Sequence, residues 1–482
     1  MSVVTSTTTK GVDYAELDRR FVWHPFTQMK DWIAGEPIVI SSGDGVILRD
    51  TQGKEYLDGN SSIWTNLHGH NHPEINEAIR AQLGKIAHSS ALGLANEPAS
   101  ILGAKLVELA GDSDRLQKVF YSDDGSTAME VAIKLAYEFA RRIKSQRTPR
   151  FLSLEGAYHG DTVGAVSVGH VELFHKAYQG LLFATDKVMA PYCYRCPYNR
   201  AAPERADARS YRKCNWECVG KVEEKFATAK SEGNPISAMV VEPLMQGAAG
   251  MIPQPEGWLR RVSEIVSENG AQLIADEVMT GFGRTGSIFA CQKETVTPDF
   301  LCVAKGLTGG YLPMAATLTT QEVFNAFLGE YDEFKTFFHG HSYTGNQLGC
   351  AAALKSIEIL ERDEEIKKRE ALERTLQSEL DTLWDLPQVG DIRCVGLIAG
   401  IELVRNWNTR EMFELRERAG IRLCEHMARN GVLTRPIGSV IVLMPPYCTT
   451  TTQVKTMVRT LRNAIEQLPK EGQTPGKSEH QL

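Results

Sequence analysis

The feature that most constrains the fold is a series of short apolar runs separated by longer segments of helical periodicity. These runs lie at residues 118–122, 151–154, 236–241, 272–275 and 300–303. Amphipathic helical patterns occupy residues 125–142 and 258–269, between successive runs. Short apolar runs are typical of strands that are buried on both faces of a sheet. Because the runs alternate with helices, the sequence predicts an α/β fold with a mostly parallel sheet.

The pattern changes after about residue 346, where long helices and further strands are expected. Helical patterns follow at 348–362 and 365–383, and strand-like runs at 396–403 and 440–444. Residues 39–58 carry paired strand signals near the other end of the chain, and chain ends often meet in space. The predicted units are an N-terminal segment, 1–75, that joins the small domain, a large domain, 76–345, and a C-terminal small domain, 346–482. The polar ends, 1–10 and 470–482, are expected to lack regular structure.

The composition is that of a soluble globular protein and argues against several partners. The chain has 482 residues, of which 42% are hydrophobic and 23% charged. Its formal net charge of -7 argues against nucleic acid or an anionic membrane as a partner. No apolar run approaches the length of about 18 residues that a membrane-spanning helix needs. Ten cysteines in a chain of this length do not indicate a disulfide scaffold, so we expect a cytoplasmic protein with reduced thiols.

Two of the apolar runs end in side chains that carry chemistry. One run leads into Asp276, and ligands of open parallel sheets bind beyond the carboxyl ends of the strands. A carboxylate there suits a pyridine nitrogen that must stay protonated, although a helix cap or a Mg²⁺ ligand would fit as well. A second run leads into Lys305 and a glycine-rich turn. A lysine in this place is either a nucleophile that forms a Schiff base or an ordinary surface lysine.

Two turns add a phosphate site and a stacking surface. Gly125 and Ser126 come between a predicted strand and a predicted helix, where free backbone N–H groups and a hydroxyl can bind a phosphate. A plain helix cap is the simpler interpretation of the same residues. Tyr158 lies in a turn flanked by glycines, from which an aromatic ring can stack on a cofactor.

In this order, the four features resemble the class III aminotransferases of pyridoxal-phosphate (PLP) fold type I. The string Gly281-Phe-Gly-Arg-Thr-Gly286 between the acid and the lysine strengthens the resemblance, which covers about residues 21–467. The resemblance implies PLP as the cofactor and three catalytic residues. Lys305 would hold PLP and carry protons, Asp276 would pair with the pyridine nitrogen, and Tyr158 would stack on the ring.

The same resemblance implies the remaining cofactor contacts and the assembly. Gly125 and Ser126 would hold the phosphate of PLP. The family forms homodimers with active sites at the interface, so Ser342 would reach the phosphate bound by the neighbouring subunit. The substrates are small molecules, and amino groups would move in two half-reactions through one lysine.

Motifs near the chain ends resemble the branch of this family that makes 7,8-diaminononanoate for biotin synthesis. They are Trp23-His-Pro-Phe26, His68-Gly-His-Asn-His-Pro73, Phe338-His-Gly340-His-Ser342 and Arg435-Pro436. The resemblance places Phe26, Ile63, Trp64 and Gly340 at the substrate and assigns a substrate carboxylate to Arg435. Phe26 and Ile63 stand where this branch usually has Tyr and Trp. This favours lysine over S-adenosylmethionine as the amino donor.

Two other functions remain compatible with these patterns. One is another class III ω-aminotransferase, acting on 4-aminobutyrate, ornithine or a diamine. The other is a catalytically silent protein of the same fold, which intact Lys305 and Asp276 argue against.

Two further groups of residues have types and spacings that resemble those of metal ligands. The spacings of Cys193 with Cys196 and of Cys214 with Cys218 would suit zinc or an iron–sulfur cluster. Transamination needs no metal, so we expect no metal in this protein. Free thiols in a surface insert are the simpler interpretation of the four cysteines. His68, His70 and His72 alternate along the chain, but the residues between them indicate polar packing in a loop.

Overall fold

The computed structural model describes residues 12–111 and 115–468 and contains a seven-stranded central sheet. The strand order is β4-β12-β11-β10-β7-β5-β6. The bounds are β4 Leu116–Ser122, β5 Arg150–Leu154, β6 Asp186–Val188, β7 Ile236–Val241, β10 Gln272–Asp276, β11 Phe300–Val303 and β12 Ala315–Thr320. Strand β12 pairs antiparallel with both neighbours, and the other pairs are parallel. The mostly parallel α/β sheet is therefore confirmed. The polar ends, 1–10 and 470–482, lie outside the described residues.

Helices cover both faces of this sheet, which explains why inner strands such as β7 and β11 are almost entirely apolar. In β7, Ala238 and Val240 pack into the hydrophobic cluster that contains helix α6 (Gly125–Ile143). The intervening Met239 and Val241 pack on the opposite side. That side is covered by helices α5 (Glu97–Ala110), α10 (Glu217–Ser231) and α11 (Trp258–Glu268). Successive side chains of a strand point to opposite faces, so a strand buried on both sides loses the alternation of polar and apolar residues.

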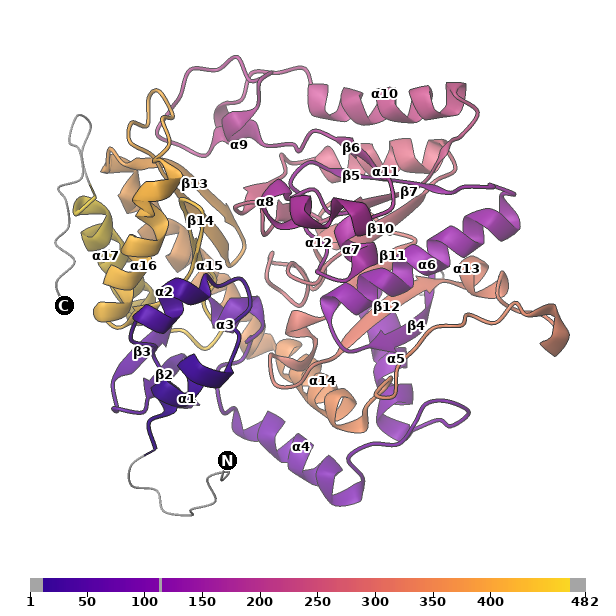
Figure 1. Cartoon of the computed structure of the whole chain (residues 1–482), viewed down its shortest axis with the longest axis horizontal. Helices are drawn as coiled ribbons and strands as arrows, with labels where there is room; N and C mark the ends of the chain where they lie inside the picture. Colours follow the sequence, from indigo (N-terminus) through magenta and orange to yellow (C-terminus); the bar gives the residue numbers. More distant parts are fainter. Residues whose placement is uncertain (1–11, 112–114, 469–482) are drawn as a thin grey trace.

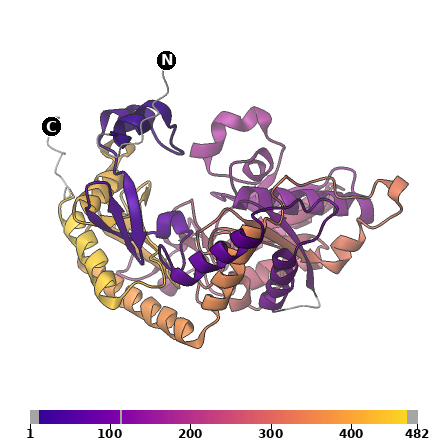
Figure 2. The same cartoon turned by 90° about the horizontal axis from the view of Figure 1, so that it is seen from below.

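Of the two smaller four-stranded sheets, one joins the N-terminal and C-terminal parts of the chain and the other is built from the C-terminal part alone. The first has the order β1-β2-β3-β15, with β1 Ile40–Asp44, β2 Ile47–Asp50, β3 Glu55–Asp58 and β15 Val432–Leu433. The second has the order β13-β14-β17-β16, with β13 Val389–Val395, β14 Ile398–Leu403, β17 Val440–Leu443 and β16 Pro436–Ile437. Strand β3 runs parallel to β15, with Asp58 opposite Leu433. Residues far apart in sequence thus share one sheet, and Figures 1 and 2 show the indigo N-terminal elements beside the yellow C-terminal ones.

The remaining elements are helices and one short hairpin. The helices are α1 Tyr14–Phe21, α2 Met29–Ala34, α3 Ser61–Trp64, α4 Pro73–Lys85, α7 Val163–Ser167, α8 Glu172–His175, α9 Ala208–Tyr211, α12 Ala290–Lys293, α13 Gln321–Asn325, α14 Gln347–Leu360, α15 Asp363–Asp381, α16 Ala419–Arg429 and α17 Thr451–Glu466. The hairpin is β8 Met245–Gln246 with β9 Ile252–Pro253. Among the described residues, no helix is both long enough and apolar enough to cross a membrane.

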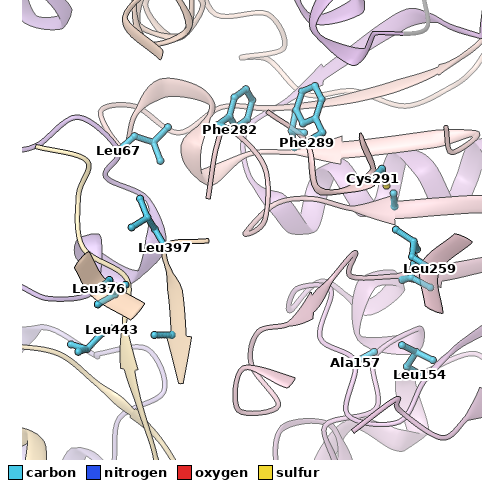
Figure 3. Packing of buried hydrophobic residues seen from close by; sticks show 14 of the residues in the cluster. Leu67, Leu154, Ala157, Leu259, Phe282, Phe289, Cys291, Leu376, Leu397 and Leu443 are labelled. Atoms are coloured by element: carbon cyan, nitrogen blue, oxygen red, sulfur yellow. The ribbon is translucent and has the colours of Figure 1, made fainter. Parts of the chain in front are cut away.

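One hydrophobic cluster continues from the central sheet into the smaller sheets. Phe282 and Phe289 lie side by side in it, with ring centroids 5.6 Å apart and an edge-to-face angle of 69°. Figure 3 also shows Leu397 and Leu443 of the C-terminal part in the same cluster. A continuous core fixes the smaller sheets against the edge of the central sheet where its parallel strands end.

Candidate active site

The candidate site is a cavity of about 210 Å³ at the carboxyl ends of the parallel strands. Its lining comes from loops that follow five different strands of the sheet and from the N-terminal segment. The lining residues are Trp64, Asp124, Gly125, Ser126, Tyr158, His159, Gly160, Glu242, Ala248, Asp276, Val278, Met279, Thr280 and Lys305. The sheet thus brings together Lys305, Asp276, Tyr158 and the Gly125-Ser126 turn, which the sequence predicted separately.

Adjacent parallel strands place Asp276 and Lys305 in the same site. Asp276 is the last residue of β10, and Lys305 follows β11 by two positions. The two strands pair directly, with Asp276 opposite Cys302. Both side chains therefore emerge at the same edge of the sheet.

The environment of Lys305 favours a neutral amine. Burial lowers the pKa of Lys305, while the negative charges of Asp276 and Glu242 act in the opposite direction. Its Nζ lies over the ring of Trp64, 5.2 Å from the centroid. A lysine with a lowered pKa in an enclosed site can act as a nucleophile towards a carbonyl carbon.

Asp276 is held by a histidine that the sequence did not single out as a site residue. The Asp276 side chain is only 6% exposed, and its Oδ2 accepts a hydrogen bond of 2.7 Å from Nδ1 of His159. Its other oxygen accepts from the backbone N–H of Val278, at 3.1 Å. Among the described residues, Nε2 of His159 has no hydrogen-bond partner. The histidine therefore orients the carboxylate of Asp276, which is one of the residues that line the cavity.

The N-terminus of α6 lies on the cavity and forms a cradle that can hold a phosphate. Its first residues are Gly125 and Ser126, and Asp124 caps the helix by accepting from the N–H of Thr127 at 2.8 Å. A Cβ atom at Gly125 would lie 2.6 Å from a methyl group of Val278. A Cβ atom at Gly160 would overlap Ser126 Oγ. The two glycines thus let Val278 and Ser126 pack closely beside the helix N-terminus, which lines the cavity and attracts anions.

Tyr158 connects the cavity with the N-terminal segment. Its hydroxyl donates a hydrogen bond of 2.6 Å to Asp161, and burial raises its pKa. Its ring meets Phe174 edge-on at 6.1 Å, and Phe174 meets Phe26 at 5.2 Å. Phe26 is 60% exposed, so it lies at the outer end of an aromatic series that leads from the cavity to the surface.

Glu242 is a second site residue that sequence reasoning missed. It follows directly on β7 and is buried, and this burial raises its pKa to about 7. Its carboxyl group accepts from the backbone N–H groups of Tyr158, at 3.2 Å, and Gly247, at 2.8 Å. The position of Glu242 at a strand end is the same signal that identified Asp276, and it could have found this residue too.

Trp64 enters the cavity from a left-handed helical turn. The four residues Ser61 to Trp64 all have positive φ angles, between 49° and 71°. The turn carries helical hydrogen bonds from Trp64 N–H to the Asn60 carbonyl, at 2.8 Å, and from Thr65 N–H to the Ser61 carbonyl, at 2.9 Å. Left-handed helical geometry costs roughly 1–2 kcal/mol per non-glycine residue, and such strain clusters at functional sites.

The other predicted substrate residues lie outside the cavity of a single chain. Ile63 is 41% exposed beside Trp64. Gly340 and Ser342 are exposed on a loop, where the Ser342 carbonyl accepts from His88 Nε2 at 2.7 Å. Arg435 is exposed on the turn between β15 and β16. The fold of one chain therefore brings Trp64 to Lys305 but leaves these four residues at its surface.

Comparison with known proteins places this geometry in a family. The model of the class III aminotransferases matches residues 31–465. The chain belongs to the class III aminotransferases. An adenosylmethionine-8-amino-7-oxononanoate aminotransferase of Geobacter sulfurreducens is 48% identical over 448 residues, which cover 93% of this chain and 96% of that protein. The protein of the same name from Methanocaldococcus jannaschii is 43% identical and covers 93% of this chain and 97% of its own length.

Solved structures show the same fold. The crystal structure of the Methanocaldococcus jannaschii aminotransferase has a TM-score of 0.86 at 41% identity and covers 94% of this chain and 98% of its own. A PLP-bound amine transaminase from an uncultivated Pseudomonas species has a TM-score of 0.84 at 32% identity and covers 92% and 98% of the two chains. These likenesses confirm PLP fold type I for this class III aminotransferase.

The cofactor of this class III aminotransferase is PLP, and the cavity fits it. A phosphate suits the cradle at Gly125 and Ser126, and the carboxylate of Asp276 on the cavity lining suits a protonated pyridine nitrogen. Lys305 supplies the amine on the same cavity wall as Trp64. PLP requires three features of a protein: a cradle for its phosphate, a carboxylate for its pyridine nitrogen and a lysine amine that holds it.

The cysteines and histidines whose spacing resembles that of metal ligands lie in two separate parts of the fold. Cys193, Cys196, Cys214 and Cys218 line one small cavity, and all four are free thiols. Within the part of the chain that the structure describes, no group of three or more His, Cys, Asp or Glu side chains is placed to hold a metal ion. His68 is instead hydrogen-bonded to Ser356 Oγ at 2.9 Å, and burial lowers its pKa to about 3.

Proposed function

We propose that this class III aminotransferase converts 8-amino-7-oxononanoate to 7,8-diaminononanoate in biotin synthesis. The names of the curated relatives support this substrate, because those relatives match this chain over nearly their whole length. The observation that carries the proposal is Lys305 beside Trp64, on a cavity that the Asp276–His159 pair also lines. The free thiols are in keeping with a cytoplasmic protein.

Five residues of the cavity have a role in the proposal. When bound, PLP supplies an electron sink for the bond that breaks at the substrate amine. Lys305 holds the cofactor. Its amine also carries the proton between a carbon atom of the substrate and a carbon atom of the cofactor. Asp276 keeps the pyridine nitrogen protonated, Tyr158 stacks on the ring, and Gly125 and Ser126 bind the phosphate.

The proposed assembly is a homodimer with the substrate sites at its interface. Gly340 and Ser342 lie on an exposed loop, where Ser342 would approach the phosphate bound by the other subunit. Apolar side chains are exposed on the same loop and nearby, with Leu92 at 92% and Phe338 at 74%. Large exposed apolar groups in one region are typical of an oligomer interface.

The proposed domains are 1–75 with 346–482 as the small domain and 76–345 as the large domain. The pairing of β3 with β15 supports this division, because it joins the two ends of the chain in one sheet. Arg435 follows β15 by two positions, and we assign it to a substrate carboxylate, which a planar guanidinium can bind with two hydrogen bonds.

For the amino donor we favour lysine over S-adenosylmethionine. Phe26 has no hydroxyl and Ile63 has no indole, so the outer wall offers an adenine less hydrogen bonding and less stacking. One lost hydrogen bond costs roughly 0.5–1.5 kcal/mol and one lost stacking surface roughly 1–3 kcal/mol. Lysine has no adenine and still presents a carboxylate to Arg435.

The test is formation of 7,8-diaminononanoate from 8-amino-7-oxononanoate with each donor at equal concentration. We expect product with lysine and a kcat/KM for S-adenosylmethionine lower by about one to three decades. Product with S-adenosylmethionine and none with lysine would contradict the donor assignment alone. Amination of succinic semialdehyde, with no product from 8-amino-7-oxononanoate, would identify a 4-aminobutyrate type of ω-aminotransferase and overturn the substrate.

A further inference from the structure

The carboxylate of Asp58 is the centre of a hydrogen-bond network below the left-handed turn. Asp58 is the last residue of β3 and is 1% exposed. Its Oδ1 accepts from the backbone N–H groups of Asn60, at 3.3 Å, and Ser62, at 3.0 Å. Its Oδ2 accepts from Ser62 Oγ and from His70 Nε2, both at 2.9 Å. Four donors thus satisfy one buried carboxylate.

The second nitrogen of His70 completes the network. The side-chain amide of Asn66 donates to His70 Nδ1 at 3.2 Å, while its oxygen accepts from the N–H of Gly69 at 2.7 Å. Nδ1 is therefore the acceptor, and the proton of a neutral ring sits on Nε2, directed at Asp58. The histidine is fixed from both sides.

This network lies at the start of the turn that carries Trp64. The N–H groups of Asn60 and Ser62 are held by Asp58, and the turn then continues through its own hydrogen bonds to Trp64 and Thr65. Asn66, the partner of His70, follows the turn directly. Asp58 and His70 thus hold both ends of a segment whose backbone is strained along four residues.

The same carboxylate also sits beside the strand that leads to Arg435. Asp58 is paired with Leu433, and the N–H of Gly59 donates to the Leu433 carbonyl at 2.8 Å. Two proposed substrate residues, Trp64 and Arg435, therefore extend from one pair of strand ends.

We propose that His70 and Asp58 are positioning residues that hold Trp64 against the substrate at Lys305. The inference rests on the proposed function for the identity of the substrate. Neither side chain lines the cavity, so both act through the left-handed turn. Without the His70 donor, the buried charge of Asp58 loses one of its partners, and the strained turn relaxes away from Lys305.

The first experiment observes the turn itself in the PLP-bound protein. Hydrogen–deuterium exchange of the Trp64 and Thr65 amides is compared in wild type, His70→Ala and His70→Gln. We expect exchange at least tenfold faster in His70→Ala and close to wild type in His70→Gln, because the glutamine amide can donate to Asp58. Unchanged exchange in His70→Ala would contradict the proposal that the network holds the turn. Equal acceleration in both variants would do the same.

The second experiment separates substrate binding from chemistry. In His70→Ala we expect KM for 8-amino-7-oxononanoate to rise about tenfold, equivalent to about 1.4 kcal/mol, with kcat within twofold and KM restored in His70→Gln. His72→Ala is the control, since His72 lies in the same loop away from Asp58. An unchanged KM in His70→Ala, or an equal rise in His72→Ala, would overturn the positioning role. If wild type does not turn over this ketone, the proposed function fails, while the exchange measurement still decides on the network.

Discussion

Nδ1 of His159 lies 2.7 Å from Oδ2 of Asp276, and both side chains are buried beneath the cavity. The two residues are 117 positions apart in sequence and meet because their loops follow strands that end at the same edge of the sheet. The histidine fixes the direction of the carboxylate, so that the proposed partner of the pyridine nitrogen does not depend on solvent for its orientation.

Replacing His159 should therefore weaken catalysis without removing the cofactor site. In His159→Phe the ring volume stays but the donor to Asp276 is lost. A hydrogen bond to a charged group contributes about 1.5–3 kcal/mol, so we expect kcat to fall by about ten- to a hundredfold. In His159→Asn the amide can donate in place of Nδ1 and should recover part of this loss. Steady-state kinetics measure both variants, and equal losses in the two would argue against a hydrogen-bonding role.

Asp276→Asn should keep the fold and lose most of the activity. The amide oxygen can still accept from His159, but the negative charge opposite the pyridine nitrogen is gone. We expect the rate of the first half-reaction to fall at least about a hundredfold, equivalent to about 2.7 kcal/mol. Rapid-mixing absorbance measurements follow this step. A rate close to wild type would mean that another group keeps the ring protonated.

Lys305→Ala should abolish transamination by several orders of magnitude, because the group that holds the cofactor and the group that moves the proton are lost together. Lys305→Arg is the matched variant that keeps a positive charge, and it should be equally inactive. Borohydride reduction followed by peptide mass spectrometry provides a second readout. The cofactor should be fixed on the peptide that contains Lys305 in wild type and on no peptide in either variant.

The buried carboxyl group of Glu242 predicts a pH dependence of stability. Burial raises its pKa from the ordinary 4.5 to about 7, so the folded protein holds this proton more tightly than the unfolded chain. The free energy of unfolding should therefore fall as pH rises from about 5 to about 7, by at most about 3 kcal/mol for this group. Glu277 has the same raised pKa and acts in the same direction. Urea unfolding of the cofactor-free protein should show a shallower pH dependence in Glu242→Gln, and an unchanged slope would contradict the assignment.

The sequence predicted those strands and helices that are determined by the local spacing of apolar residues. The strand predicted at 236–241 agrees with β7, and the helix predicted at 125–142 agrees with α6 to within one residue. Asp276 and Lys305 were found because a charged residue that ends an apolar strand is conspicuous. Strand β12 was missed because its sequence, Ala-Ala-Thr-Leu-Thr-Thr, contains only one large apolar side chain.

The parts that could not be predicted depend on contacts between distant segments. Residues 61–64 contain no glycine, so nothing local indicates a left-handed turn there. The turn exists because Asp58, His70 and the C-terminal strands hold it, and those contacts form only in the folded molecule. The pairing of His159 with Asp276 is hidden for the same reason.

The pairing of β3 with β15 also sets the order in which the molecule can be completed as it leaves the ribosome. Residues 55–58 are synthesised early, but their partner strand appears only at residues 432–433. The Gly59 amide donates to the Leu433 carbonyl and the Ser61 hydroxyl donates to the Met444 carbonyl. These acceptors are also synthesised late. Pairings this distant in sequence are slow to form. The nascent chain can assemble its central sheet first, and the wall that carries Trp64 is the last part of the cavity to be built.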